Sequence, residues 1–356
     1  IPQQAPARTE DVAEPIKEMK PASETRKGEQ DRELSEKAAE RLRSGDYEQA
    51  ISLYGELSEK DKNAFTGLGV SYFKMGYHEQ ATAALEKAVE QNEKDFTARK
   101  ILAVLYYKKD DLEKSLAHAS AGLSLKRDPE LLSLYEKLRR DAGVRSNFIN
   151  ETTSHFRVHF DGYEHGALSR NILEILEDAY GAIGRELNYF PSEPLDVILY
   201  TNRDFHDVTR APRWSGGIYD GKIRIPVRGI NGREAFLKKV LFHEYTHAVV
   251  YSLTPRCPLW VNEGLAEFFS QNHTRKIGQI IPLQSLESSF AWLSGSSVGL
   301  AYQESYSAVA YLMETHGVFR MKEFLLALSG DADLNAAFNK AFSISYQQFL
   351  REWGKG

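Results

Sequence analysis

The sequence contains a single cysteine, Cys257, among 356 residues. An intramolecular disulfide is therefore excluded, and any metal site must be built mainly from histidine and carboxylate ligands. No uninterrupted apolar run reaches the length of about 18 residues that a membrane helix needs, which argues against a membrane span. The formal net charge is −5, which gives no hint of nucleic-acid binding, a function that favours a basic surface.

Methionine is also missing from the first position, where the chain has Ile1 and Pro2. We therefore expect that a segment was removed, either by signal cleavage or by trimming. Residues 1–30 contain proline and many charges but almost no large apolar side chains, a composition typical of a flexible tail. The tail would act as a tether if a signal or lipid attachment preceded it, and a plain flexible terminus is the alternative.

What the sequence does contain, over residues 31–143, is a repeated helical pattern. Three turn phrases lead into small residues at Ala50, Ala81 and Ser115, spaced by 31 and 34 residues. Helix pairs with a period of about 34 residues are typical of tetratricopeptide repeats. The second unit predicts helices over 64–72 and 81–88, where small residues allow neighbouring helices to approach closely. A last helix near 130–140 is expected to cap an all-α solenoid.

A second domain is predicted over residues 150–356, after the helical pattern stops. Alternating apolar residues predict strands at 155–160, 195–200 and 217–226, with a helix at 167–187 between the first two. Nearly everything after residue 233 has a helical pattern. Strands followed by helices indicate an α+β domain.

The helix predicted for 235–251 carries two histidines at helical spacing. His243 and His247 are four residues apart, so both imidazoles lie on one face and one Zn²⁺ ion can accept both. Glu244 is rotated by about 100° from His243. This is the H-E-x-x-H pattern, in which the glutamate is the general base that activates water. A helix with two unliganded histidines is the alternative.

A third ligand is available on the next predicted helix. Glu263 lies 16 residues after His247, which is far enough for the chain to turn and for a second helix to cross the first. Its surroundings are strongly apolar, where an unpaired carboxylate is costly. Glu267 lies one turn later, and we expect it to hydrogen-bond a liganding imidazole. Three protein ligands would leave a fourth position open.

These phrases resemble a known family. HEYTH followed by WVNEGLAEFF resembles the gluzincin metallopeptidases, and residues from about 155 to 353 resemble the peptidase MA-like domain that often accompanies tetratricopeptide repeats in bacterial proteins. The phrases GGIYDGKIRIP and AYQESYSAVAYLMETHG fit that pattern. The resemblance implies a zincin-like α+β fold, in which His243, His247 and Glu263 bind zinc and Glu244 is the base. The spacing between His247 and Glu263 is shorter than in aminopeptidase-like gluzincins, so we expect a trimmed loop between the two helices.

The resemblance extends to two further parts of the site. Tyr302 matches the tyrosine of the Y-x-K-G phrase that stabilises the oxyanion, although Glu304 and Ser305 replace its lysine and glycine, and Tyr306 is a rival for the role. Residues 217–226 are implied to form the edge strand above the zinc, with Gly217, Ile218 and Tyr219 contacting an extended peptide. The acidic phrase that holds a substrate amine in related aminopeptidases is missing, which favours an endopeptidase.

The sequence thus predicts a zinc endopeptidase that acts on a peptide or protein, with repeats that bind a partner or the substrate. One alternative is a repeat-based binding protein whose second domain is latent or inactive. Another is a zinc hydrolase with a non-peptide substrate. From the missing methionine, the tail and the resemblance, we expect a periplasmic or envelope-associated location in a bacterium.

Overall fold

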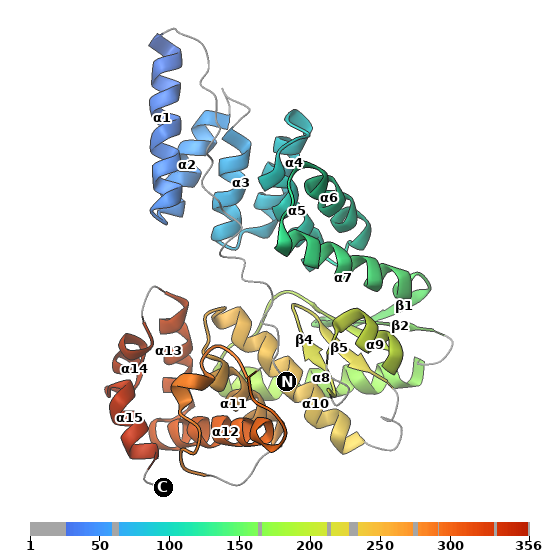
Figure 1. Ribbon diagram of the computed structural model, residues 1–356, viewed down its shortest axis with the longest axis vertical. Coiled ribbons are helices and arrows are strands. Elements are labelled where there is room, and N and C mark those ends of the chain that lie inside the picture. Colours follow the sequence, from blue (N-terminus) through green and yellow to red (C-terminus); the bar gives the residue numbers. More distant parts are fainter. Residues whose placement is uncertain are drawn as a thin grey trace. The chain divides into compact units, whose positions relative to one another are not determined.

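A computed structural model describes residues 26–58, 64–162, 166–211, 215–227, 234–272, 277–290, 292–330 and 333–354 (Figure 1). Within these ranges the chain forms two compact units, one ending at Val144 and the other beginning at Arg145. The first unit consists of helices, and the second combines a small sheet with helices. The predicted fold class, a helical repeat domain followed by an α+β domain, is confirmed. No helix of the described residues is long and apolar enough to cross a membrane.

The first unit is a succession of antiparallel helix pairs (Figure 1). The turns within its three pairs share one backbone feature, because Gly45, Gly76 and Asp110 all adopt a positive φ. They occupy equivalent places in the three repeated phrases, and the left-handed conformation lets each turn reverse the chain tightly. The helices are α1 (Arg26–Arg43), α2 (Tyr47–Ser58), α3 (Ala64–Lys74), α4 (His78–Gln91), α5 (Phe96–Lys108), α6 (Leu112–Leu125) and α7 (Pro129–Arg145).

Small residues bring the repeat helices together. A Cβ on Gly67 would lie 2.3 Å from the ring of Tyr54, and one on Gly69 would lie 2.5 Å from Leu85. Ala81 and Ala88 are buried on α4, as the close approach of its neighbours requires. Side chains larger than these would force the helices of the second repeat apart.

Both ends of this unit differ from the expectation. Residues 1–25 of the predicted tail lie outside the described residues, but α1 already begins at Arg26, so 26–30 are helical rather than part of the tail. At the other end α7 continues to Arg145, past the expected stop near residue 140. Polar, charged segments carry little apolar periodicity, so the sequence pattern marks such helix ends poorly.

The second unit contains a five-stranded sheet in the order β1-β2-β3-β5-β4. The central pairs β2–β3 and β3–β5 are parallel, and the outer pairs β1–β2 and β4–β5 are antiparallel. The strands are β1 (Phe148–Thr152), β2 (Phe156–Asp161), β3 (Leu195–Tyr200), β4 (Ile218–Tyr219) and β5 (Ile223–Pro226). The prediction missed β1, whose side chains are half-buried or exposed and therefore lack a clear alternation.

The single strand predicted for 217–226 is wrong. It is a hairpin, because Gly221 adopts a φ of +96° and reverses the chain between β4 and β5. Of the two strands of this hairpin, only β4 is at an edge of the sheet, whereas β5 lies between β4 and β3. The edge that faces away from β5 is therefore only two residues long.

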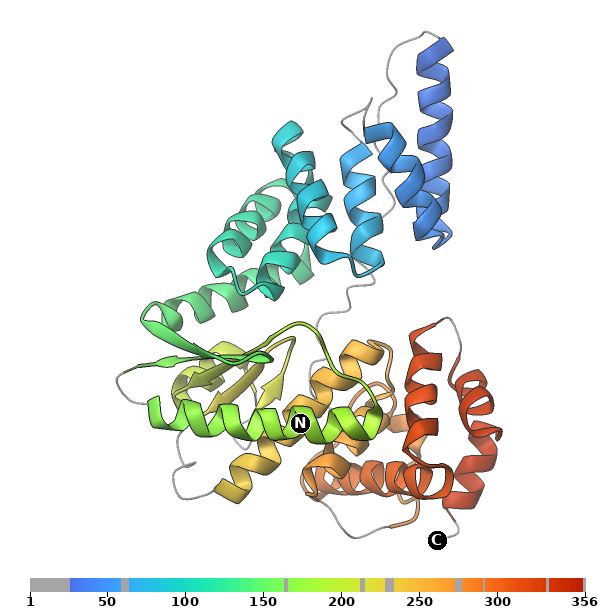
Figure 2. The same ribbon diagram turned by 180° about the vertical axis from the view of Figure 1, so that it is seen from behind.

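Helices cover the sheet and make up most of the rest of the unit (Figure 2). Alternate residues of β2, namely Phe156, Val158 and Phe160, are buried in the main core together with the apolar side of the long helix α8. The helices are α8 (Gly166–Leu187), α9 (Asn202–Thr209), α10 (Glu234–Leu253), α11 (Leu259–Ser270), the 3₁₀ helix η2 (Leu283–Leu286), α12 (Ser296–His316), α13 (Val318–Ser329), α14 (Leu334–Phe342) and α15 (Tyr346–Trp353). The helix α11 packs against both α10 and α12.

Candidate metal centre

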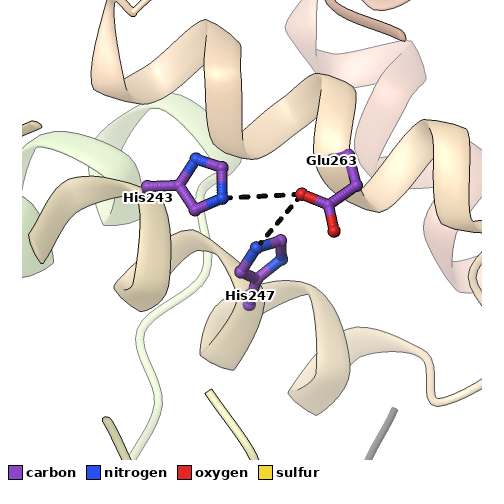
Figure 3. Close-up of side chains that lie close together, drawn as sticks. All are labelled: His243, His247 and Glu263. Atoms are coloured by element: carbon purple, nitrogen blue, oxygen red, sulfur yellow. Dashed lines mark ion pairs between the residues drawn. The ribbon is translucent and has the colours of Figure 1, made fainter. Parts of the chain in front are cut away.

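Two histidines of α10 and one glutamate of α11 converge on one point. The Nε2 atoms of His243 and His247 each lie 3.5 Å from Oε2 of Glu263 (Figure 3). One ligand atom from each of the three residues lies within 4.8 Å of the others. The two rings are 4.7 Å apart and nearly perpendicular, so their nitrogens approach a common centre from different directions. This is the set of residues that the sequence motif predicted.

The helix α11 brings Glu263 to this point. The chain leaves α10 at Leu253, turns through Thr254–Pro258, and enters α11 at Leu259. Behind Glu263 the helix approaches α12 very closely, because a Cβ on Gly264 would lie 2.3 Å from the carbonyl oxygen of Ser305. The stretch Asn231-Gly232-Arg233-Glu234 has the sequence of a capping box ahead of α10, but its first three residues lie outside the described residues.

Each of these two imidazoles has a partner on its Nδ1 nitrogen. Nδ1 of His247 lies 3.0 Å from Oδ1 of Asn262, and Nδ1 of His243 lies 3.3 Å from Oε1 of Glu267. An Nδ1–H donated to such an oxygen leaves Nε2 with its lone pair directed at the centre. Sequence reasoning named Glu267 but missed Asn262, although Asn262 directly precedes Glu263 in the motif.

The centre is largely buried, and burial favours the uncharged forms of its side chains. Burial raises the pKa of the Glu263 carboxyl, and it lowers the pKa of His247 to about 4. Within the described part of the chain, Nε2 of His247 and both carboxylate oxygens of Glu263 have no hydrogen-bond partner. Buried polar atoms without partners are costly, and a metal ion at this point would satisfy them. Two neutral imidazoles and a carboxylate are ligands that suit zinc.

Glu244 lies beside the three ligands without belonging to them. Its side chain is only 3% exposed, and it accepts a hydrogen bond from the backbone N–H of Tyr219 in β4. Its Oε2 atom has no hydrogen-bond partner among the described residues. Burial, followed by the nearby charges of Glu263 and Asp220, raises the pKa of Glu244 well above its ordinary value. Such a carboxylate suits the task of accepting a proton.

The two candidate tyrosines of α12 differ in their surroundings. Tyr302 is 8% exposed, and burial followed by the charges of Glu263, Glu244 and Glu267 raises its pKa well above the ordinary value. Tyr302 therefore lies within electrostatic range of the candidate centre. The ring of Tyr306 stacks on Phe268 with centroids 6.4 Å apart. The acids of the centre thus act on Tyr302, whereas Tyr306 has a ring contact with α11, and the oxyanion role of either residue stays a prediction.

The predicted substrate strand lies next to Glu244. A Cβ on Gly217 would lie 3.1 Å from Cγ of Glu244, so only glycine fits there without displacing that side chain. The Gly217 carbonyl accepts a hydrogen bond from the Ser215 hydroxyl, and the backbone N–H of Tyr219 donates a hydrogen bond to Glu244. Two of the backbone groups near the edge therefore already have partners.

Glu304, which departs from the family phrase, has a structural task. Its buried carboxylate accepts hydrogen bonds from the backbone N–H groups of Ile280 and Ile281. It thereby fastens the connection between α11 and α12 to α12 itself. That connection also contains Phe290, whose ring packs edge-on against Tyr302 with centroids 5.5 Å apart. The sequence carried no signal for this contact, because it depends on a loop more than twenty residues away.

Comparison with protein families agrees with this arrangement. Residues 183–355 match the model of the Peptidase MA superfamily, and residues 63–95 match the model of a tetratricopeptide repeat. The second unit thus carries a domain of the Peptidase MA superfamily, and the helical unit contains a tetratricopeptide repeat. No curated protein matches the chain. The superfamily indicates a peptidase-type domain, and the repeat indicates protein–protein interaction.

Proposed function

We propose that the second domain is a zinc-dependent endopeptidase. The observation that carries this proposal is the convergence of His243, His247 and Glu263 beside a buried glutamate, Glu244, that is not part of the ligand set. A buried cluster of this kind without a cation would leave several polar atoms unsatisfied. The superfamily match supports peptide-bond hydrolysis as the class of reaction.

The three ligands would hold zinc, which supplies a Lewis acid that polarises the substrate carbonyl and lowers the pKa of water. Glu244 then accepts the proton of the attacking water, because its Oε2 atom is directed to no partner in the described residues. The N–H of Tyr219 fixes the other end of that carboxylate relative to the edge strand. Tyr302 stays protonated at neutral pH because of its raised pKa, so its hydroxyl can donate to the developing oxyanion.

The contacts of Asp220 support cleavage within a chain rather than at its amino terminus. Asp220 is the only acid in the β4–β5 hairpin, and both its carboxylate oxygens accept hydrogen bonds from Nε of Arg224. Arg224 is fully buried, so the two charges offset each other. Asp220 is therefore a poor anchor for the free amine of a substrate.

The repeat domain would bind a partner protein or deliver the substrate. A tetratricopeptide repeat supports protein binding but names no partner. A latent second domain is the main alternative, and it predicts zinc binding without turnover.

The test uses an unstructured polypeptide with an acetylated amino terminus and an amidated carboxyl terminus. Zinc-loaded wild-type protein should release internal fragments that mass spectrometry identifies, and Glu244→Gln should release them about 10²- to 10⁴-fold more slowly. Cleavage of the same polypeptide with free ends, but not of the blocked form, would contradict the endopeptidase assignment. Equal fragments from wild type and Glu244→Gln would reveal a contaminating protease and contradict the role of Glu244.

A further inference from the structure

Two lysines at the end of α5 lie beside a histidine at the start of α4 in the repeat domain. Lys108 is the last residue of α5, and Lys109 caps that helix. The Nζ atom of Lys108 lies 3.5 Å from Nε2 of His78, the first residue of α4. Both groups border Phe73, whose ring centroid is 6.0 Å from Nζ and 6.1 Å from the centre of the His78 ring.

A lysine at a helix end normally needs no explanation, because it interacts favourably with the last carbonyl groups. Lys108 differs, since its ammonium lies against an imidazole and an aromatic ring instead. Burial lowers the pKa of Lys108. The like charges of Lys108 and Lys109 add to burial in lowering the pKa of His78 to about 4. No acid of the described residues forms an ion pair with Lys108 or Lys109.

Another lysine of the same helix, Lys100, has acidic partners that compensate its buried ammonium group. Lys100 is 6% exposed, and its Nζ atom lies 3.0 Å from Asp128 and 2.9 Å from Glu130. Burial alone would lower the pKa of Lys100, but these two acids raise it above its ordinary value. The helix α5 therefore carries one compensated lysine and one uncompensated lysine.

We propose that Lys108 and Lys109, with His78 holding Lys108 in place, form an anion-binding site whose ligand is a carboxylate of a bound partner protein. The site lies in and beside the stretch that matches a tetratricopeptide repeat, which indicates protein binding. His78 is neutral at pH 7 and accepts the Lys108 hydrogen bond, so the two ammonium groups present the charge. A carboxylate would supply the counter-charge that the described residues do not.

The test is a titration of the full chain, labelled with ¹⁵N in its histidine rings, with a hexaglutamate peptide whose ends are blocked. The ring signals of His78 should shift saturably at pH 7, where the side chains of hexaglutamate are ionised, because the anion would bind beside Lys108, which contacts His78. Hexaglutamine should produce no shift. A separate titration uses inorganic phosphate, a different anion that could bind the same two ammonium groups.

Two matched variants distinguish binding at this site from nonspecific attraction to the positive charges of the repeat domain. Lys108→Met keeps an apolar stem over Phe73 and should weaken hexaglutamate binding at least about tenfold. Lys87→Met removes a lysine that lies 5.3 Å over the Phe65 ring in the same unit and should leave binding unchanged. Saturation by phosphate but not by hexaglutamate would overturn the carboxylate assignment. The absence of a shift with either probe, or equal binding by Lys108→Met, would overturn the site.

Discussion

Gly264 offers a sharp test of how the metal centre is built, because it sits beside Glu263 at the closest approach of α11 to α12. In Gly264→Ala the new Cβ would lie 2.3 Å from the Ser305 carbonyl oxygen and 2.5 Å from a methyl group of Val309. Ordinary carbon–oxygen contacts are about 3.3 Å or longer, so the helices must separate by about 1 Å. The obstacle includes backbone, which no change of rotamer removes.

The expected loss of unfolding free energy in Gly264→Ala follows from two opposing effects. Overpacking of this kind costs about 1–3 kcal/mol, and the better helix propensity of alanine returns about 1 kcal/mol. Because the contact is to backbone, we expect a net destabilisation of the second domain of about 2 kcal/mol. Glu263 moves with α11, and zinc sites tolerate ligand displacements of only about 0.2 Å. Zinc affinity should therefore fall at least about tenfold.

Gly299→Ala is the matched control. Gly299 lies in α12, and an added Cβ there meets nothing within 4 Å. This variant should gain up to about 1 kcal/mol of stability and keep wild-type zinc affinity. Denaturant unfolding and a competitive zinc titration measure both quantities for each variant. Wild-type stability and zinc affinity in Gly264→Ala would refute the close approach of the two helices.

Further predictions concern residues around the site and in the repeats. Asn262→Ala should lower zinc affinity about 10- to 100-fold in a competitive titration, because His247 loses the acceptor that orients it; wild-type affinity would contradict this role. Glu304→Ala should destabilise the second domain by about 1–3 kcal/mol in denaturant, because two backbone N–H groups lose a buried carboxylate; an unchanged midpoint would argue against that anchor. Tyr302→Phe should lower kcat with little change in KM, since its hydroxyl acts on the oxyanion only in the transition state; a loss confined to KM would assign it to binding. The depressed pKa of His78 means that the unfolded chain binds more protons between pH 6.5 and about 4, so stability of the repeat domain should fall as pH falls through that window; the loss should be smaller in His78→Gln, and equal pH dependence would contradict the shift.

Much of the site could be predicted because it depends on local spacing. His243 and His247 share one helix, so four residues of separation are enough to place them together. Glu263 followed from the distance needed to turn and from the cost of a carboxylate in an apolar stretch. The structure brings these three residues together, with Glu244 beside them. Their roles, the domain boundaries and the envelope location stay predictions.

The parts that sequence could not supply depend on contacts between distant segments. Arg224 donates a hydrogen bond to Asp220 within the β4–β5 hairpin. The sequence pattern predicted a single strand there, because the turn between the two strands depends on the backbone conformation of Gly221. Glu304 finds its partners in a loop that carries no periodic signal. Strand β1 escaped detection because half-buried residues without alternation give no period.

The central claim, a zinc-dependent peptidase with Glu244 as its base, is tested most directly by measuring bound zinc and polypeptide cleavage on the same preparations of wild type and Glu244→Gln. We predict stoichiometric zinc in both proteins, because Glu244 is not a ligand. Cleavage should be lower in Glu244→Gln by about 10²- to 10⁴-fold, the usual contribution of a general base. Wild-type protein that is purified without chelators and holds no zinc would contradict the metal centre, and zinc-loaded wild type that cleaves no faster than Glu244→Gln would contradict the enzyme.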